Sequence, residues 1–188
     1  LAGWFCHSVC HQKWSHRSNQ GHRGRRLITE RKTNFDQNSI SGRKIVCCFC
    51  STDDDWKNEQ IQALIKDYPD VETKIKDAIA SKRFGLGKVI YAKGNETSIV
   101  AILTVVKSNQ VQYPYLYGAL LDITLRAFQA KAFIVMTEPY MKLSNNQWSK
   151  IKPMLSRCIG ITQKSSEDTQ TFDAPTKVTA IVQAPKSY

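Results

Sequence analysis

Four cysteine and histidine side chains near the start of the chain have the chemistry of a zinc site. Cys6, Cys10, His16 and His22 are separated by three, five and five residues. Thiolate sulfur and imidazole nitrogen are the ligands that zinc prefers. The spacing is nearer to a zinc knuckle than to a zinc finger, and two further histidines blur the pattern. We therefore expect no cofactor and a metal-free histidine-rich tail, and zinc bound by these four residues is the alternative.

The same N-terminal stretch is strongly basic. Residues 1–46 contain nine Lys and Arg against two acids, whereas the rest of the chain contains eighteen against fourteen. Aromatic residues lie among these cations, which suits phosphate contacts and base stacking. We expect a nucleic-acid partner, RNA rather than DNA, or a neighbouring subunit of an assembly, and a solvated tail is the alternative. The predicted nucleic-acid-binding residues are Arg17, Arg23, Arg25, Arg26, Arg31 and Lys32.

A second stretch that could do chemistry runs from Cys50 to Lys66. An apolar run that begins at Ile45 ends in Ser51, Thr52 and Asp53, which are good helix N-cap residues, and a helical pattern follows. A strand that leads into a helix N-terminus is a common place for ligands, often phosphates. Phosphate sites usually have glycine there, so that backbone N–H groups can reach the anion, and this stretch has none.

Alternating strands and helices must position these residues. Strands are predicted over 43–50, 88–92, 98–106, 132–136 and 178–182, and helices after 53, after 70, from 113 and from 145 or 146. Residues 163–175 are predicted to be a polar loop. One exposed side of a helix is predicted to carry four cations, Lys74, Lys76, Lys82 and Arg83. Residues 1–42 lack periodicity. We therefore predict an α/β domain over 43–188, a three-layer α/β/α domain with a mixed sheet, preceded by a basic N-terminal arm over 1–42.

Composition sets the remaining limits. No apolar run is long enough for a transmembrane helix, so no membrane partner is expected. The six cysteines include three in or beside a predicted buried strand, where small apolar packing is the usual role, which favours an intracellular, reducing compartment. The chain begins with Leu1, as a product of a viral polyprotein, an organellar precursor or a partial chain would.

The order of these elements resembles the macro domain, the ADP-ribose-binding α/β/α fold, and within it the branch of terminal ADP-ribose protein glycohydrolases. The resemblance spans about residues 43–183. Three stretches carry it: Phe49-Cys50-Ser51-Thr52-Asp53-Asp54 with its helix, the strand pair 88–92 and 98–104 with the helix from Tyr113, and the strand 132–136 with Leu143-Ser144-Asn145-Asn146-Gln147-Trp148 and its helix. It implies a ligand cleft, whose candidate residues here are Cys50, Asp54, Asn58, Gln60, Tyr140 and Ser144.

The chain departs from that family at the residues that matter most. Asn58 and Gln60 stand where the branch has glycines, and the second phosphate loop, 137–143, has no glycine. Val105 and Ser144 stand where the branch uses a Lys and an Asp, and Lys107 is a poor substitute without the acid. Asp54 matches a family acid, but with acids on both sides it also suits a solvated helix start.

Two functions follow. The first is a non-catalytic macro-like structural or interaction module whose basic arm contacts nucleic acid or a neighbouring subunit. The alternative is a divergent ADP-ribose-binding or ADP-ribosyl-hydrolase macro domain. The missing glycines and the missing Lys and Asp favour the first function, so we expect no catalytic residues.

Overall fold

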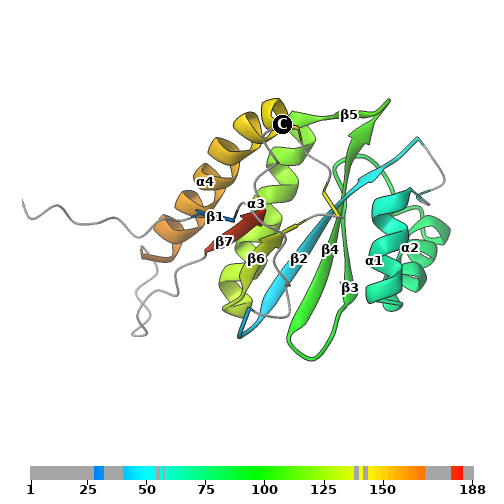
Figure 1. The fold of residues 1–188 in the computed structure, drawn as a ribbon, viewed down its shortest axis with the longest axis horizontal. Coiled ribbons are helices and arrows are strands. Elements are labelled where there is room, and N and C mark those ends of the chain that lie inside the picture. The colour runs from blue at the N-terminus through cyan, green and yellow to red at the C-terminus, as the bar shows by residue number, and fades with distance from the viewer. Residues whose placement is uncertain are drawn as a thin grey trace, which may run out of the picture.

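The computed structural model describes residues 28–31, 40–53, 56, 58–137, 140–141, 144–167 and 179–183. These residues form a seven-stranded sheet with helices on both faces (Figure 1). The elements are β1 (Ile28–Arg31), β2 (Lys44–Ser51), α1 (Glu59–Asp67), α2 (Asp70–Ala80), β3 (Val89–Lys93), β4 (Ser98–Lys107), β5 (Gln110–Val111), α3 (Tyr113–Ala130), β6 (Phe133–Met136), α4 (Asn145–Glu167) and β7 (Ala180–Gln183). The predicted three-layer α/β/α architecture with a mixed sheet is confirmed.

The strands lie in the order β1-β7-β6-β2-β4-β3, with β5 paired to β4. Every pairing from β1 to β4 is parallel, and only β3 and β5 run antiparallel to β4. The predicted hairpin between β3 and β4 is confirmed. Because the parallel strands need crossover connections, the helices between them cover the sheet.

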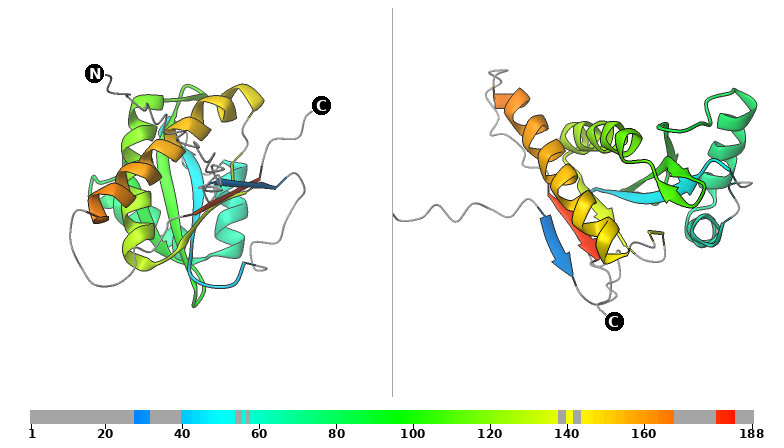
Figure 2. Two further views of the ribbon diagram at one scale, coloured as in Figure 1. Left: turned by 90° about the vertical axis from the view of Figure 1, so that its left-hand side faces the viewer. Right: turned by 90° about the horizontal axis from the view of Figure 1, so that it is seen from above.

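Strand β2 shows how the two faces are filled. Its alternate residues point to opposite faces, as the twofold repeat of a strand requires. Cys47 and Phe49 pack with α3 and α4, whereas Cys48 and Cys50 pack with α1 and α2. Figure 2 shows the two helix pairs on opposite sides of the sheet. A strand that is buried on both faces has a continuous run of apolar residues in its sequence, which is why β2 could be predicted.

Three elements differ from the sequence-based expectation. Residues 28–31, predicted within the arm, form β1 and pair in parallel with β7. Helix α4 runs to Glu167, so residues 163–167 of the predicted polar loop are helical, and Pro153 lies inside the helix. The short strand β5 was not predicted. Residues 1–27 and 32–39 lie outside the described residues, so the arm is described only at β1, Ile40 and the two residues that follow it.

None of the described helices is long and apolar enough to cross a membrane.

Candidate functional site

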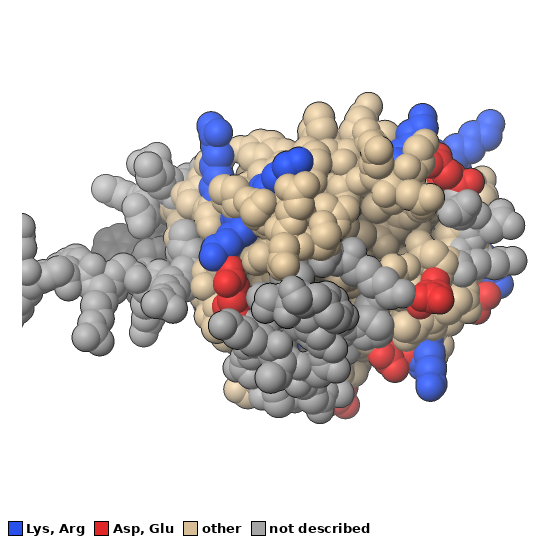
Figure 3. Space-filling model, turned by 45° about the horizontal axis from the view of Figure 1, so that its top comes forward, with Lys and Arg blue, Asp and Glu red and all other residues tan. Residues whose placement is uncertain are grey.

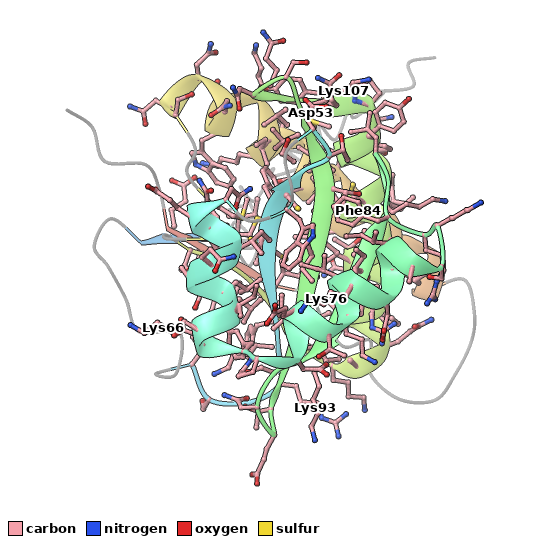
Figure 4. All side chains as sticks on the ribbon, turned by 90° about the vertical axis from the view of Figure 1, so that its right-hand side faces the viewer. Asp53, Lys66, Lys76, Phe84, Lys93 and Lys107 are labelled. Atoms are coloured by element: carbon pink, nitrogen blue, oxygen red, sulfur yellow. The ribbon has the colours of Figure 1, made fainter. Side chains whose placement is uncertain are left out.

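The described cleft candidates belong to segments that lie at or follow the ends of β2 and β6. Because β2 runs parallel to both β4 and β6, these three strands end on the same side. The chain leaves β2 toward α1 and leaves β6 toward α4, so both helices begin near this side. We call it the carboxyl edge; Asp53 and Lys107 lie there in Figure 4.

The polar residues that follow β2 are bound to the β4–β5 hairpin. The backbone N–H of Thr52 donates to the Val106 carbonyl at 3.1 Å. A carboxylate oxygen of Asp53 accepts a hydrogen bond from the Ser108 backbone N–H, and the Ser51 hydroxyl oxygen accepts one from the Asp53 N–H at 3.2 Å. The prediction that Ser51, Thr52 or Asp53 caps the helix is therefore wrong, because Ser51 ends the strand and Asp53 holds a turn distant in sequence.

Asn58 is the residue that caps α1. Its side-chain oxygen accepts a hydrogen bond from the Ile61 N–H at 2.9 Å, and its backbone is extended. Its carbonyl accepts the Gln62 N–H, also at 2.9 Å. Gln60 lies half-buried in the first turn of the helix. The Asn58 side chain thus accepts a hydrogen bond from one of the helix N-terminal N–H groups. In a glycine-rich loop, an anion would bind to these N–H groups.

Ser144 plays the same part at α4. Its hydroxyl oxygen accepts a hydrogen bond from the Gln147 N–H at 3.2 Å, and the Gln147 side-chain oxygen accepts one from the Ser144 N–H at 2.9 Å. This reciprocal pair is a capping box. The prediction that Asn145 or Asn146 caps the helix is corrected, because the helix begins at Asn145. A Ser followed three residues later by Gln was the signal in the sequence.

Cys50 and Tyr140 come together, but in the core. Both belong to the apolar cluster under α1 and α2. Tyr140 is 2% exposed, and its hydroxyl donates to the Asp67 carboxylate. Burial raises the pKa of the Cys50 thiol to about 12, so it carries almost no thiolate near neutral pH. These two side chains fill space between the sheet and the helices.

The positions that correspond to the family Lys and Asp have structural roles as well. Val105 is fully buried against α3 and α4. Lys107 is exposed at the end of β4, opposite Gln110 of β5. Ser144 is the α4 cap described above. The described residues therefore place no lysine and carboxylate pair at these positions.

Several predicted residues lie outside the described part of the chain. These are Asp54 of the cleft, the four zinc candidates Cys6, Cys10, His16 and His22, and the basic residues Arg17, Arg23, Arg25, Arg26 and Lys32. Of Arg31 the structure describes the backbone, in β1. Within the described ranges, no group of three or more His, Cys, Asp or Glu side chains could hold a metal ion.

On the face shown in Figure 3, the described Lys and Arg side chains do not form one continuous patch, and several lie beside acids. Three other cations come together in the structure, although the sequence did not indicate that they would. Lys74, Arg83 and Lys88 line one hollow between α2 and β3, with a volume of about 500 Å³. The sequence showed two of them only as members of an exposed helical side.

No protein-family model and no curated protein is similar to this chain in sequence. Solved structures are similar in fold. A macrodomain protein from Streptomyces coelicolor is 17% identical, and the match covers 84% of this chain and 99% of that one, with a TM-score of 0.64. The macrodomain of Thermus aquaticus DarG is 12% identical, with coverage of 84% and 99% and a TM-score of 0.59. A tomato leucine aminopeptidase mutant is 10% identical over 85% of this chain and 32% of that one, with a TM-score of 0.58.

These identities establish the fold alone. The two macrodomains are matched over nearly their whole length, so the chain has a macro-domain fold. The aminopeptidase has the same arrangement in part of its chain. A fold shared by proteins with such different names does not determine an activity, which has to be argued from the residues at the site.

Proposed function

We propose that this macro-fold chain is a non-catalytic interaction module whose basic arm, residues 1–42, contacts nucleic acid or a neighbouring subunit. The observation that carries the non-catalytic part is that both helix N-termini at the carboxyl edge are capped by the chain itself. Asn58 bonds to the Ile61 N–H of α1, and Ser144 bonds to the Gln147 N–H of α4.

These caps matter because of what a diphosphate would need. Backbone N–H groups at a helix N-terminus, together with the helix dipole, form an anion site when small residues leave them open. Asn58 and Ser144 fill part of that space with side chains and already satisfy one donor each. An acid, Glu59, in the first turn of α1 further disfavours a phosphate group. The carboxyl edge is thus better suited to holding the loops than to holding a ligand.

The absence of a reactive group among the described cleft residues supports the same view. The Cys50 thiol is buried with a raised pKa, and no histidine follows His22 in the chain. A nucleophile needs a lowered pKa or an adjacent base, and Cys50 has neither. The charge imbalance of residues 1–46 supports the contact with an anionic partner.

Isothermal titration of ADP-ribose into the full chain tests the non-catalytic part. We expect no heat of binding up to millimolar ligand, because a capping side chain fills part of the space and occupies one donor at each helix start. AMP serves as the matched ligand that lacks the diphosphate and the second ribose. Micromolar binding of ADP-ribose but not of AMP would overturn the proposal and establish the alternative, a divergent ADP-ribose-binding or ADP-ribosyl-hydrolase domain.

A further inference from the structure

Among the described strands, β3 is the outermost on one side of the sheet. It is the last strand in the sheet order, and its described neighbour is β4. The Lys93 N–H donates at 2.8 Å to the Asp70 carboxylate of α2, so it points away from β4. In an antiparallel pair the main-chain groups alternate in direction. The N–H and C=O groups of Val89 and Tyr91 therefore also point outward, and within the described part of the chain no strand pairs with them.

This edge is held firmly in place. The Tyr91 hydroxyl donates to Asp122 of α3 at 2.9 Å, and the Arg126 guanidinium lies 4.1 Å from the centre of the Tyr91 ring. At the start of the strand, the Lys88 N–H donates to the Thr104 hydroxyl oxygen at 3.0 Å. The side chain of Tyr91 thus packs against α3, on one face of the sheet. Its backbone is held in place as a template to which another strand could pair.

A groove runs along this template, between β3 and α2. Its volume is about 500 Å³, and buried Ala78 and Ile90 form its floor. The rim carries three exposed cations, Lys74, Arg83 and Lys88, against one exposed acid, Asp77. None of the three cations forms an ion pair with a described residue. Figure 4 labels Phe84, which follows α2, and Lys93, the last residue of β3.

We infer that this groove binds an acidic peptide segment, which adds to the sheet as an extra strand beside β3. Peptides bind in this way where an edge strand and a helix form a slot, with main-chain hydrogen bonds for affinity and side-chain contacts for specificity. Val89 and Tyr91 offer about four such hydrogen bonds. The three cations, which form no ion pair with a described residue, favour acidic side chains, although the Arg83 Nε–H also donates a hydrogen bond to the Ser81 hydroxyl at 2.8 Å. Asp70 already occupies the Lys93 N–H and ends the pairing at that point.

Nucleic acid fits the same charges less well. Its phosphates would pair with Lys74, Arg83 and Lys88, but its backbone has no regular row of N–H and C=O groups to match an edge strand. The outward main-chain groups of Val89 and Tyr91 favour the peptide.

Fluorescence anisotropy with the full chain tests the inference. The probe is a labelled ten-residue peptide of alternating Glu and Thr, with blocked ends. We expect saturable binding, and we expect the variant R83E/K88E to bind on the order of tenfold more weakly, because it reverses the charge at one end of the groove. The variant K66E changes an exposed lysine of α1 away from the groove and should bind like the unchanged chain. Equal losses in R83E/K88E and K66E would overturn the inference.

A second probe separates strand addition from simple charge attraction. The same peptide methylated on every backbone nitrogen keeps its charge but cannot donate hydrogen bonds to β3, so it should not bind measurably. Equal binding of both peptides, or complete displacement of the peptide by a short RNA, would show a general anion surface instead. Far-UV circular dichroism of each variant checks the fold. If R83E/K88E does not fold, K74E on the exposed side of α2 makes the same test.

Discussion

One buried hydroxyl group holds the turn between α2 and β3. Thr104 is fully buried in β4, and its hydroxyl lies within hydrogen-bond distance of the carbonyls of Gly85 and Lys88 and of the Lys88 N–H. We expect Thr104→Val to lower the free energy of unfolding by about 1–3 kcal/mol, since it leaves buried polar groups without a partner. Urea unfolding measures this. Thr104→Ser keeps the hydroxyl and should lose less, so an equal loss in both variants would contradict this explanation.

The buried thiols give a prediction about reactivity and pH. Burial raises the pKa of Cys47 from its ordinary value of 9.0 to about 12, and that of Cys50 also to about 12. At about pH 8, iodoacetamide should therefore modify these thiols only after unfolding, because the thiolate is the reactive form. Mass spectrometry of digested native and urea-treated protein resolves each cysteine.

The same shift sets the sign of a stability change. The folded state keeps its thiol protons at a pH at which the unfolded chain has lost them. The thiols' contribution to stability is thus fully present below pH 9.0 and is lost as the pH rises toward 12. Rapid labelling of Cys47 in the native protein at about pH 8 would contradict both expectations.

Among the elements, α1 shows the limit of local sequence signals. Ser51, Thr52 and Asp53 resemble caps, yet the helix begins eight residues after Ser51, at Glu59. The Asp53 carboxylate instead accepts a hydrogen bond from the backbone N–H of Ser108, which is 55 residues away in sequence. A local sequence pattern cannot indicate such a distant partner. By contrast, β2 and the hairpin of β3 and β4 were predictable, because burial and a short turn leave local patterns. Strand β1 was missed because it is four residues long and pairs with β7 near the other end of the chain.

The cap itself can be tested. We expect Asn58→Ala to destabilise the protein by about 1 kcal/mol, because the Ile61 N–H loses its partner. Asn58→Asp restores an acceptor and should remain close to the unchanged protein. Thermal unfolding followed by circular dichroism compares the two. If alanine and aspartate behave alike, the hydrogen bond to Ile61 contributes little to the start of α1.

Strand β1 is attached to α4 through Glu30. Its carboxylate lies 2.6 Å from the Lys152 ammonium and accepts a hydrogen bond from the Trp148 ring N–H at 3.3 Å. Both charged groups are partly exposed, so the ion pair alone is worth at most about 1 kcal/mol. We expect Glu30→Lys to release β1 locally, because it adds a positive charge beside Lys152. Hydrogen exchange should then rise at Ile28–Arg31 and stay low in β2.

A matched change elsewhere separates local release from general destabilisation. Lys76 and Glu72 form a comparable exposed pair on α2, at 2.8 Å. Lys76→Glu should therefore leave the exchange of β1 unchanged. Faster exchange throughout β2 and β4 in Glu30→Lys would mean that β1 supports the whole sheet.

At the scale of the whole molecule, the arm and the body cannot be separated at residue 42. Residues 28–31 supply a strand of the sheet, and Ile40 packs against Val135 and Ile181. Deletion of residues 1–42 would remove that strand and that contact along with the basic residues. A loss of binding after the deletion would then have two explanations. Substitution of the basic residues in the full chain avoids this ambiguity.

We therefore expect Arg17, Arg23, Arg25 and Arg26, all changed to Gln, to weaken the binding of a single-stranded RNA. Each phosphate contact that is lost should make the slope of log affinity against log salt concentration shallower by about 0.7. Anisotropy titrations at several salt concentrations measure this slope. Lys150→Gln with Arg157→Gln, two exposed cations of α4, is the matched control on the body. An unchanged slope in the arm variant, or an equal change in the control, would assign RNA binding to the body, because counterion release follows the residues that contact phosphate.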